Sequence, residues 1–322
     1  MNQLAATTIG SSPQPTTSRR GPTGWTWGRL FLSGLALWVV TVLVTFATKN
    51  SNLVPTIILL GSFLVPVTFV MYAFSRADAI MTAQRIFTAF VIGGVLGVLG
   101  ASLLEAEFLR TTSTFAYLWV GLIEEAVKLA ALWLIAWRLP SYTMRNGIVL
   151  GVSVGLGFAA FESAGYAFNA LFTSSGLSLF DVVETEVLRG ILTPLGHGVW
   201  TGILGGTLFA AAARYGKLRP TPALFGWYLV VALLHALWDS SRRLAVWLTL
   251  LITSTPLQWL TIESGRSPTV TAAQVHTFTI LTWAFMAMDA VLGLLLLSRR
   301  WQHAAKIDQP QPTIVPRWGW GG

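Results

Sequence analysis

Ionisable side chains of several kinds lie inside long apolar runs of this sequence. They are Glu124, Glu125, Lys128, Glu162, His197, His235 and Asp239. A charged group at bilayer depth is costly unless it is paired, neutralised or in contact with water. Carboxylates and imidazoles also take up and release protons, so together they can activate a water molecule. The set therefore predicts a buried, water-activating site.

Two of these carboxylates share a run with the lysine. In Gly-Leu-Ile-Glu-Glu-Ala-Val-Lys, a helix places Lys128 four residues after Glu124 and three after Glu125, so its ammonium can reach either carboxylate. The adjacent carboxylates repel each other while the lysine attracts both, so their proton affinities should separate. One would then act as a base beside a protonated neighbour. The alternative is a charge cluster that only holds helices together.

The other polar groups share helix faces in pairs. Phe158 with Glu162, and His235 with Asp239, are spaced i, i+4. The Asp239 carboxylate is placed to fix the tautomer of His235 and to raise its basicity. A lone helical histidine is more often a satisfied interior group. Two histidines on separate runs beside buried acids, His235 and His197, favour a functional site.

Glycines recur every four residues in two of the runs, a pattern that permits close helix contact. They are Gly147, Gly151 and Gly155 in one run and Gly198, Gly202 and Gly206 in the next. The first stripe leads towards Glu162 and the second begins beside His197. Packing of these faces would bring the two side chains together, although the stripes also have a purely structural use.

The composition identifies the elements that must position these groups. The chain of 322 residues is 54% hydrophobic and 11% charged, and its mean hydropathy is +0.64. One soluble core cannot hide this much apolar surface, and the alternation of a β-barrel is absent, so we expect an all-α polytopic bundle in the lipid bilayer. The absence of cysteine excludes disulfides, thiolate chemistry and cysteine-ligated metals. The net charge of +8 comes from basic residues between apolar runs, which indicates membrane topology and no nucleic-acid partner.

We predict about eight membrane spans, four of which form a catalytic core. They cover residues 30–48, 53–74, 86–104, 114–137, 147–171, 191–213, 224–240 and 278–297. Eight spans with the N-terminus inside place roughly 14 basic residues in cytoplasmic segments and six outside, whereas a ninth span over 244–260 gives about 11 and nine. The count favours eight spans, both termini in the cytoplasm and 244–260 in the outer interface.

This topology predicts one depth for the ionisable groups. At about 1.5 Å per residue, Glu125 lies roughly 17 Å below the outer end of its span and Glu162 about 13 Å, while His197 and His235 are shallower. All fall in the outer half of the bilayer. They therefore indicate one site that opens towards the extracytoplasmic side.

The chain ends differ from the apolar middle. Residues 1–24 are rich in Thr, Ser, Pro and Gln, which predicts a disordered cytoplasmic tail, and 301–322 are expected to form a second cytoplasmic tail. Arg19 and Arg20 resemble a twin-arginine signal, but Gly21 and Pro22 follow, so we expect an uncleaved first span. The transmembrane domain is then 25–300, with its motif-bearing core at 114–240.

Four motifs on successive runs resemble the PrsW family of membrane proteases, relatives of the type II CAAX prenyl endopeptidases. The family's E-E-x-x-K corresponds to residues 124–128, its F-x-x-x-E to 158–162, its third-motif histidine to His197 and its H-x-x-x-D to 235–239. Together the motifs span 121–239, about a third of the chain. The family often has Asn after the second-motif Glu, where this chain has Ser163, so a hydrogen bond of that Asn is not implied here.

The resemblance implies a glutamic-type peptidase that acts in regulated proteolysis. Its substrate would be a membrane-anchored protein, with anti-sigma factors as the known type of target. The residues support such chemistry, and in the mechanism that we expect, Glu125 or Glu124 with His197 activates water. His235, held by Asp239, polarises the carbonyl or protonates the leaving amine, and Lys128 tunes the carboxylates while Glu162 positions or shares a proton.

We expect this chemistry to need no cofactor, although a zinc-dependent version is the alternative. His197, His235, Glu162 and Asp239 are suitable zinc ligands, and zinc would lower the pKa of a bound water. The i, i+4 spacings do not distinguish the two versions. No H-E-x-x-H occurs, so a zincin-type site is absent.

Two other classes of function remain as alternatives. A non-catalytic scaffold or sensor could keep the same helices, but this chain retains the carboxylates, the lysine and both histidines. A proton-coupled transporter would use the same groups as a relay, and it would favour an internal repeat that the sequence does not show. Gly151-Val-Ser-Val-Gly155 matches G-x-S-x-G but lies in a predicted helix, and Asp289 has no evident partner.

Overall fold

The computed structural model describes residues 26–78, 80–110 and 115–308. Residues 1–24, predicted to form a disordered tail, lie outside the described residues, as do residues 309–322 of the second predicted tail.

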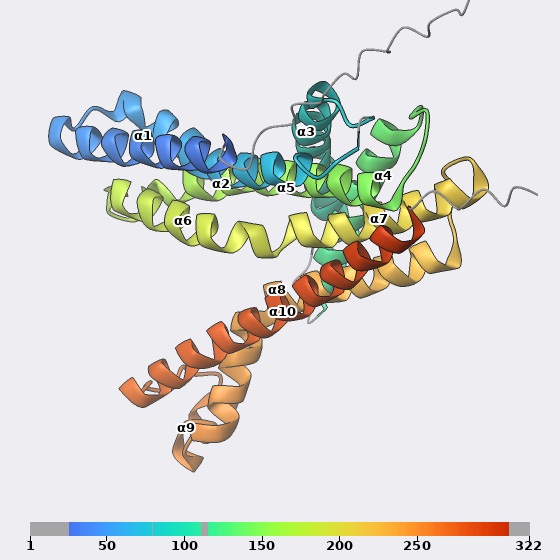
Figure 1. The fold of residues 1–322 in the computed structure, drawn as a ribbon. Helices are drawn as coiled ribbons and strands as arrows, with labels where there is room; N and C mark the ends of the chain where they lie inside the picture. Colours follow the sequence, from blue (N-terminus) through green and yellow to red (C-terminus); the bar gives the residue numbers. More distant parts are fainter. Residues whose placement is uncertain (1–25, 79, 111–114, 309–322) are drawn as a thin grey trace, which may run out of the picture.

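The described chain is helical almost throughout, so the predicted all-α bundle is confirmed (Figure 1). The longer helices are α1 (Thr26–Thr48), α2 (Val54–Phe74), α3 (Ala83–Phe108), α4 (Ala116–Ala136), α5 (Met144–Ala170), α6 (Leu179–Leu192), α7 (His197–Tyr215), α8 (Pro222–Thr253), α9 (Pro256–Glu263) and α10 (Ala272–Ile307). Short 3-10 turns cover Ser51–Leu53 and Thr193–Leu195, and a two-stranded hairpin pairs β1 (Phe172–Thr173) with β2 (Gly176–Leu177).

Each of the eight predicted spans corresponds to a helix. In the described part of the chain, six helical segments are long and apolar enough to cross a membrane: α1, α2 with its preceding 3-10 turn, α3, α5, α8 and α10. The chain is therefore a multi-pass membrane protein. The helices α4 and α7 fall outside this set, and α4 carries three charged residues within its 21 positions.

The predicted span 191–213 differs from the structure at its start. Pro194 lacks an N–H and Gly196 leaves the helical conformation, so α6 ends at Leu192 and α7 begins at His197. The amphipathic helix α6, predicted only as an outer segment, precedes this break. His197 consequently stands at the first position of α7.

The predicted segment 244–260 is not one element. The helix α8 continues past residue 240 to Thr253, and Ser254 adopts an extended conformation. A capping box between Thr255 and Gln258 then starts α9 in a new direction. In Figure 1, α9 and the adjoining ends of α8 and α10 project away from the other helices.

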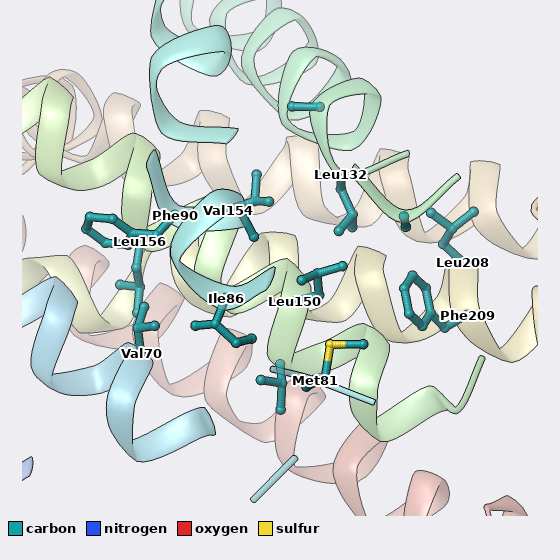
Figure 2. Packing of buried hydrophobic residues seen from close by; sticks show 14 of the residues in the cluster. Val70, Met81, Ile86, Phe90, Leu132, Leu150, Val154, Leu156, Leu208 and Phe209 are labelled. Carbon is teal, nitrogen blue, oxygen red and sulfur yellow. The ribbon is translucent and has the colours of Figure 1, made fainter. Parts of the chain in front are cut away.

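The helix α5 forms the centre of the bundle and packs against α2, α3 and α7. Figure 2 shows Leu150, Val154 and Leu156 of α5 among side chains of these helices. The glycine stripe of α5 lies against the α7 backbone, where a Cβ at Gly155 would overlap the His197 carbonyl. The predicted close contact of the two helices is thus confirmed, and it places Glu162 near His197.

Candidate active site

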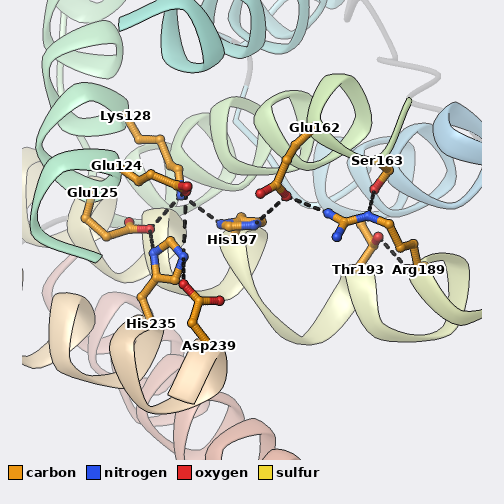
Figure 3. A network of polar contacts seen from close by, with 10 residues as sticks. All are labelled: Glu124, Glu125, Lys128, Glu162, Ser163, Arg189, Thr193, His197, His235 and Asp239. Carbon is orange, nitrogen blue, oxygen red and sulfur yellow. Dashed lines mark hydrogen bonds and ion pairs between the residues drawn. The ribbon is translucent and has the colours of Figure 1, made fainter. Parts of the chain in front are cut away.

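The four helices α4, α5, α7 and α8 bring all of the predicted site residues into one network (Figure 3). It contains Glu124, Glu125 and Lys128 from α4, Glu162 from α5, His197 from α7, and His235 and Asp239 from α8.

Lys128 lies fully buried at the centre of the network. Its Nζ is 2.7 Å from Glu125 Oε1 and 3.1 Å from Glu124 Oε2, so the predicted reach to both carboxylates is confirmed. The same atom lies 2.7 Å from His197 Nδ1 and 4.0 Å from the centre of the Phe158 ring. An ammonium can only donate, so the His197 Nδ1 atom accepts.

His235 is held by a carboxylate other than the predicted one. Its Nδ1 lies 3.0 Å from Glu125 Oε1, whereas its Nε2 lies 3.5 Å from Asp239 Oδ2 and 3.6 Å from Glu124 Oε2. The first distance is a hydrogen bond and the other two are too long for one. Glu125 therefore orients His235, and the Nε2 atom of His235 faces Glu124 and Asp239. The Trp200 ring stacks on the imidazole with centroids 4.6 Å apart.

Glu162 orients the other histidine, His197, in the same way. Its Oε2 lies 3.2 Å from His197 Nε2, as the glycine stripes predicted, and it also pairs with Arg189 of α6. Arg189 Nε donates to Ser163 Oγ at 2.7 Å. Sequence patterns do not single out Arg189, because no spacing on one helix reveals a contact between α6 and α5.

A cavity of about 460 Å³ opens beside the network. Its wall includes the carboxylates of Glu105, Glu124, Glu162 and Asp239. Glu105 of α3 is not among the residues that the sequence motifs single out. Glu125 is absent from the lining and is fully buried, so Glu124 is the member of the pair that reaches the cavity.

Three of these residues have the donor atoms of a metal site. Ligand atoms of Glu124, His197 and His235 lie within 4.8 Å of one another, the one such group indicated among the described residues. Glu162, proposed from sequence as a ligand, instead orients His197, and Asp239 lies outside the group.

The geometry around these donors suits a cation. Each imidazole bonds a carboxylate through one nitrogen, His197 through Nε2 and His235 through Nδ1, and turns the other nitrogen inward. Metal-bound histidines are commonly held by carboxylates in this way. The Lys128 ammonium already lies between His197 Nδ1 and Glu124 Oε2. Two histidines and a glutamate are a zinc donor set, so the residues fit the ion.

Two other sequence features remain outside the network. Ser153, the serine of the G-x-S-x-G match, donates to the Val149 carbonyl at 2.9 Å within α5, as expected for a helix rather than a nucleophile elbow. Asp289 of α10 is buried, and neither of its carboxylate oxygens has a hydrogen-bond partner among the described residues.

Comparison with known proteins agrees with this geometry. Residues 25–262, about three quarters of the chain, match the model of the PrsW family of intramembrane metalloproteases. A curated relative, Protease PrsW of Halalkalibacterium halodurans, is 28% identical over 164 residues, which cover 49% of this chain and 70% of the relative. No solved structure matches the chain. The chain belongs to the PrsW family of intramembrane metalloproteases.

Proposed function

We propose that this protease cleaves a membrane-anchored protein at a site that opens on the extracytoplasmic side of the bilayer. The observation that carries the proposal is the convergence of carboxylates, imidazoles and a lysine in one buried network, three of whose acidic residues, Glu124, Glu162 and Asp239, line a cavity. The side of the membrane rests on the distribution of basic residues, which favours cytoplasmic termini. An anti-sigma factor is the substrate type that the family resemblance implies.

We also propose zinc dependence, in place of the metal-free chemistry preferred from sequence. The description of the family as metalloproteases and the donor group of Glu124, His197 and His235 support this change. Those three residues would hold the ion, and zinc would polarise the substrate carbonyl and lower the pKa of a bound water.

The residues around this group have separate tasks. Glu125 and Glu162 orient the two imidazoles through the nitrogens that face away from the centre. Lys128 offsets the negative charge of Glu124 and Glu125, which would otherwise repel each other at bilayer depth.

Asp239 is the carboxylate best placed to move protons. It lines the cavity and lies 3.5 Å from His235, outside the donor group. In this position it can accept a proton from the attacking water and return it to the leaving amine. Glu105 adds a further acidic residue to the lining of the same cavity.

Cleavage-site mapping tests the substrate class and the side of the membrane. The purified chain in liposomes would receive a reporter with one membrane span, and mass spectrometry would give the mass of each product. Cuts in the outer half of the reporter span support the proposal, whereas cuts only in a soluble region or the inner half contradict it.

A topology reporter fused after Lys306 tests the side of the membrane separately. It should report a cytoplasmic position, and an extracytoplasmic signal would contradict the assigned side.

A further inference from the structure

Arg189 reaches the site from α6, a helix that carries none of the four family motifs. Its Nη2 pairs with Glu162 Oε2, its Nε donates to Ser163 Oγ at 2.7 Å, and its guanidinium carbon lies 4.3 Å from the centre of the Tyr166 ring. The Arg189 side chain is 26% exposed. A planar guanidinium can hold two acceptors in a fixed fork, which an ammonium cannot do.

The carboxylate oxygen that Arg189 holds is the one that faces the catalytic histidine. Glu162 Oε2 lies 3.2 Å from His197 Nε2, and a carboxylate accepts hydrogen bonds, so Nε2 carries the proton. On the other side of the ring, the Lys128 ammonium donates to Nδ1. The two contacts define one tautomer, with the Nδ1 lone pair facing Lys128 and Glu124.

We propose that Arg189 is a positioning residue for peptide hydrolysis. It holds the Glu162 carboxylate in the orientation that keeps the His197 proton on Nε2 and turns the Nδ1 lone pair towards the reaction centre. This inference rests on the proposed function for its effect on catalysis, while the effect on the tautomer can be observed without a substrate.

The connection between α6 and α7 places Arg189 close to His197 along the chain. Arg189 lies one turn before the end of α6, and its carbonyl accepts a hydrogen bond of 2.6 Å from Thr193 Oγ1 in the 3-10 turn. Four residues later His197 starts α7. The Arg189 side chain therefore contacts Glu162 from a turn whose main chain leads directly to His197.

A second contact of α6, between Glu186 and Ser62 of α2, makes it possible to test whether Arg189 orients His197 or only holds α6 in place. Ser62 Oγ of α2 donates to Glu186 Oε1 at 2.8 Å, and both residues are buried. This contact holds α6 against α2 and touches no residue of the catalytic network. Ser62→Ala is thus a matched control that weakens the docking of α6 and leaves Arg189 in place.

The kinetic test compares Arg189→Met, Arg189→Lys, Ser62→Ala and Glu162→Gln on one reporter substrate. Losing a residue that orients a catalytic histidine should lower kcat by about 10- to 100-fold. We expect this loss in Arg189→Met with KM within about two-fold of wild type, a smaller loss in Arg189→Lys, and a kcat within about two-fold for Ser62→Ala. Because Arg189 acts through Glu162, the double variant that combines Arg189→Met with Glu162→Gln should be no slower than Glu162→Gln alone.

The kinetic result can contradict the proposal in three ways. A wild-type kcat in Arg189→Met, additive losses in the double variant, or an equal loss in Ser62→Ala would each overturn it. Size-exclusion elution and thermal unfolding show whether each variant folds. If Arg189→Met fails to fold, the kcat of Arg189→Lys is compared with that of wild type instead.

Nitrogen NMR of ¹⁵N-histidine-labelled protein tests the tautomer directly. Wild type should show His197 protonated at Nε2, and Arg189→Met should show a mixture of tautomers. An unchanged His197 spectrum in Arg189→Met would overturn the proposal whether or not any reporter is cleaved. A shifted spectrum in a chain that cleaves no membrane protein would instead contradict the proposed function and leave the control of His197 by Arg189 standing.

Discussion

Lys128 Nζ lies 2.7 Å from His197 Nδ1, although 69 positions separate the two residues in the sequence. This contact joins the Glu-Glu-x-x-Lys helix to the start of α7 and puts a cation among the donors of the proposed metal group. The resting arrangement of the site therefore depends on the lysine as well as on the carboxylates and histidines.

Lys128→Met should destabilise the protein and abolish cleavage. The substitution leaves Glu124 and Glu125 adjacent and buried without their cation, and breaking a buried ion pair costs about 3–5 kcal/mol. Thermal unfolding in detergent measures the loss. Lys217→Met, which removes an exposed lysine after α7, should unfold like wild type. Equal unfolding temperatures for the two variants would show that the Lys128 contacts contribute nothing.

Gly155→Ala should disturb the site through the backbone. A Cβ at this position would overlap the His197 carbonyl, so α5 and α7 would have to separate, at a typical overpacking cost of about 1–3 kcal/mol. Cleavage should fall because Glu162 and His197 move apart. Gly165→Ala on the same helix, where the added Cβ meets nothing within 4 Å, is the control. If the two alanine variants cleave equally fast, the close helix contact is not needed for the site.

Glu186 should make the stability of the protein fall with rising pH. Burial raises the pKa of this α6 carboxyl from 4.5 to about 8, against the opposing effects of Ser62 and Arg189. Between these two values the unfolded chain has released the proton and the folded chain has kept it, so the free energy of unfolding decreases as pH rises from 4.5 to about 8.

The pH series of unfolding temperatures checks this sign. Glu186→Gln should show a weaker decline across the same range, whereas Glu184→Gln, which changes an exposed carboxylate of the same helix, should keep the wild-type decline. A decline that is identical in all three proteins would assign the pH dependence to other groups.

Removal of metal should stop cleavage, and zinc should restore it. Glu124, His197 and His235 supply the donors, so His235→Ala should also lower the zinc content measured by elemental analysis. Asp239→Asn, which changes a residue outside the donor group, should keep the wild-type zinc content and cleave the reporter more slowly. Full activity in a chelated, zinc-free sample would restore the metal-free mechanism preferred from sequence.

Sequence patterns predicted the contacts within single helices and one contact between two helices. Hydropathy located a helix for every expected span, and the i, i+3 and i, i+4 spacings gave the contacts of Lys128 with Glu124 and Glu125. The glycine repeats of α5 and α7 gave the one contact between helices, the approach of Glu162 to His197. These features follow from helix periodicity, which a single sequence records.

Contacts between helices were harder to predict. The i, i+4 spacing suggested Asp239 as the carboxylate that orients His235, but Glu125 from another helix lies closer. Arg189 was missed for the same reason, since its partners Glu162 and Ser163 belong to α5. The crossing positions of packed helices decide these two pairs, and the spacings of the residues involved do not record those positions.

The initial rate of cleavage of a single-span reporter, measured in membranes for wild type and three site variants, tests the central claim most directly. Wild type should cleave, and Glu124→Gln, Glu125→Gln and His197→Ala should each lose at least about 10-fold in rate, because each removes a donor or an orienting carboxylate. Equal cleavage by all four proteins would contradict the assignment of this network as the active site.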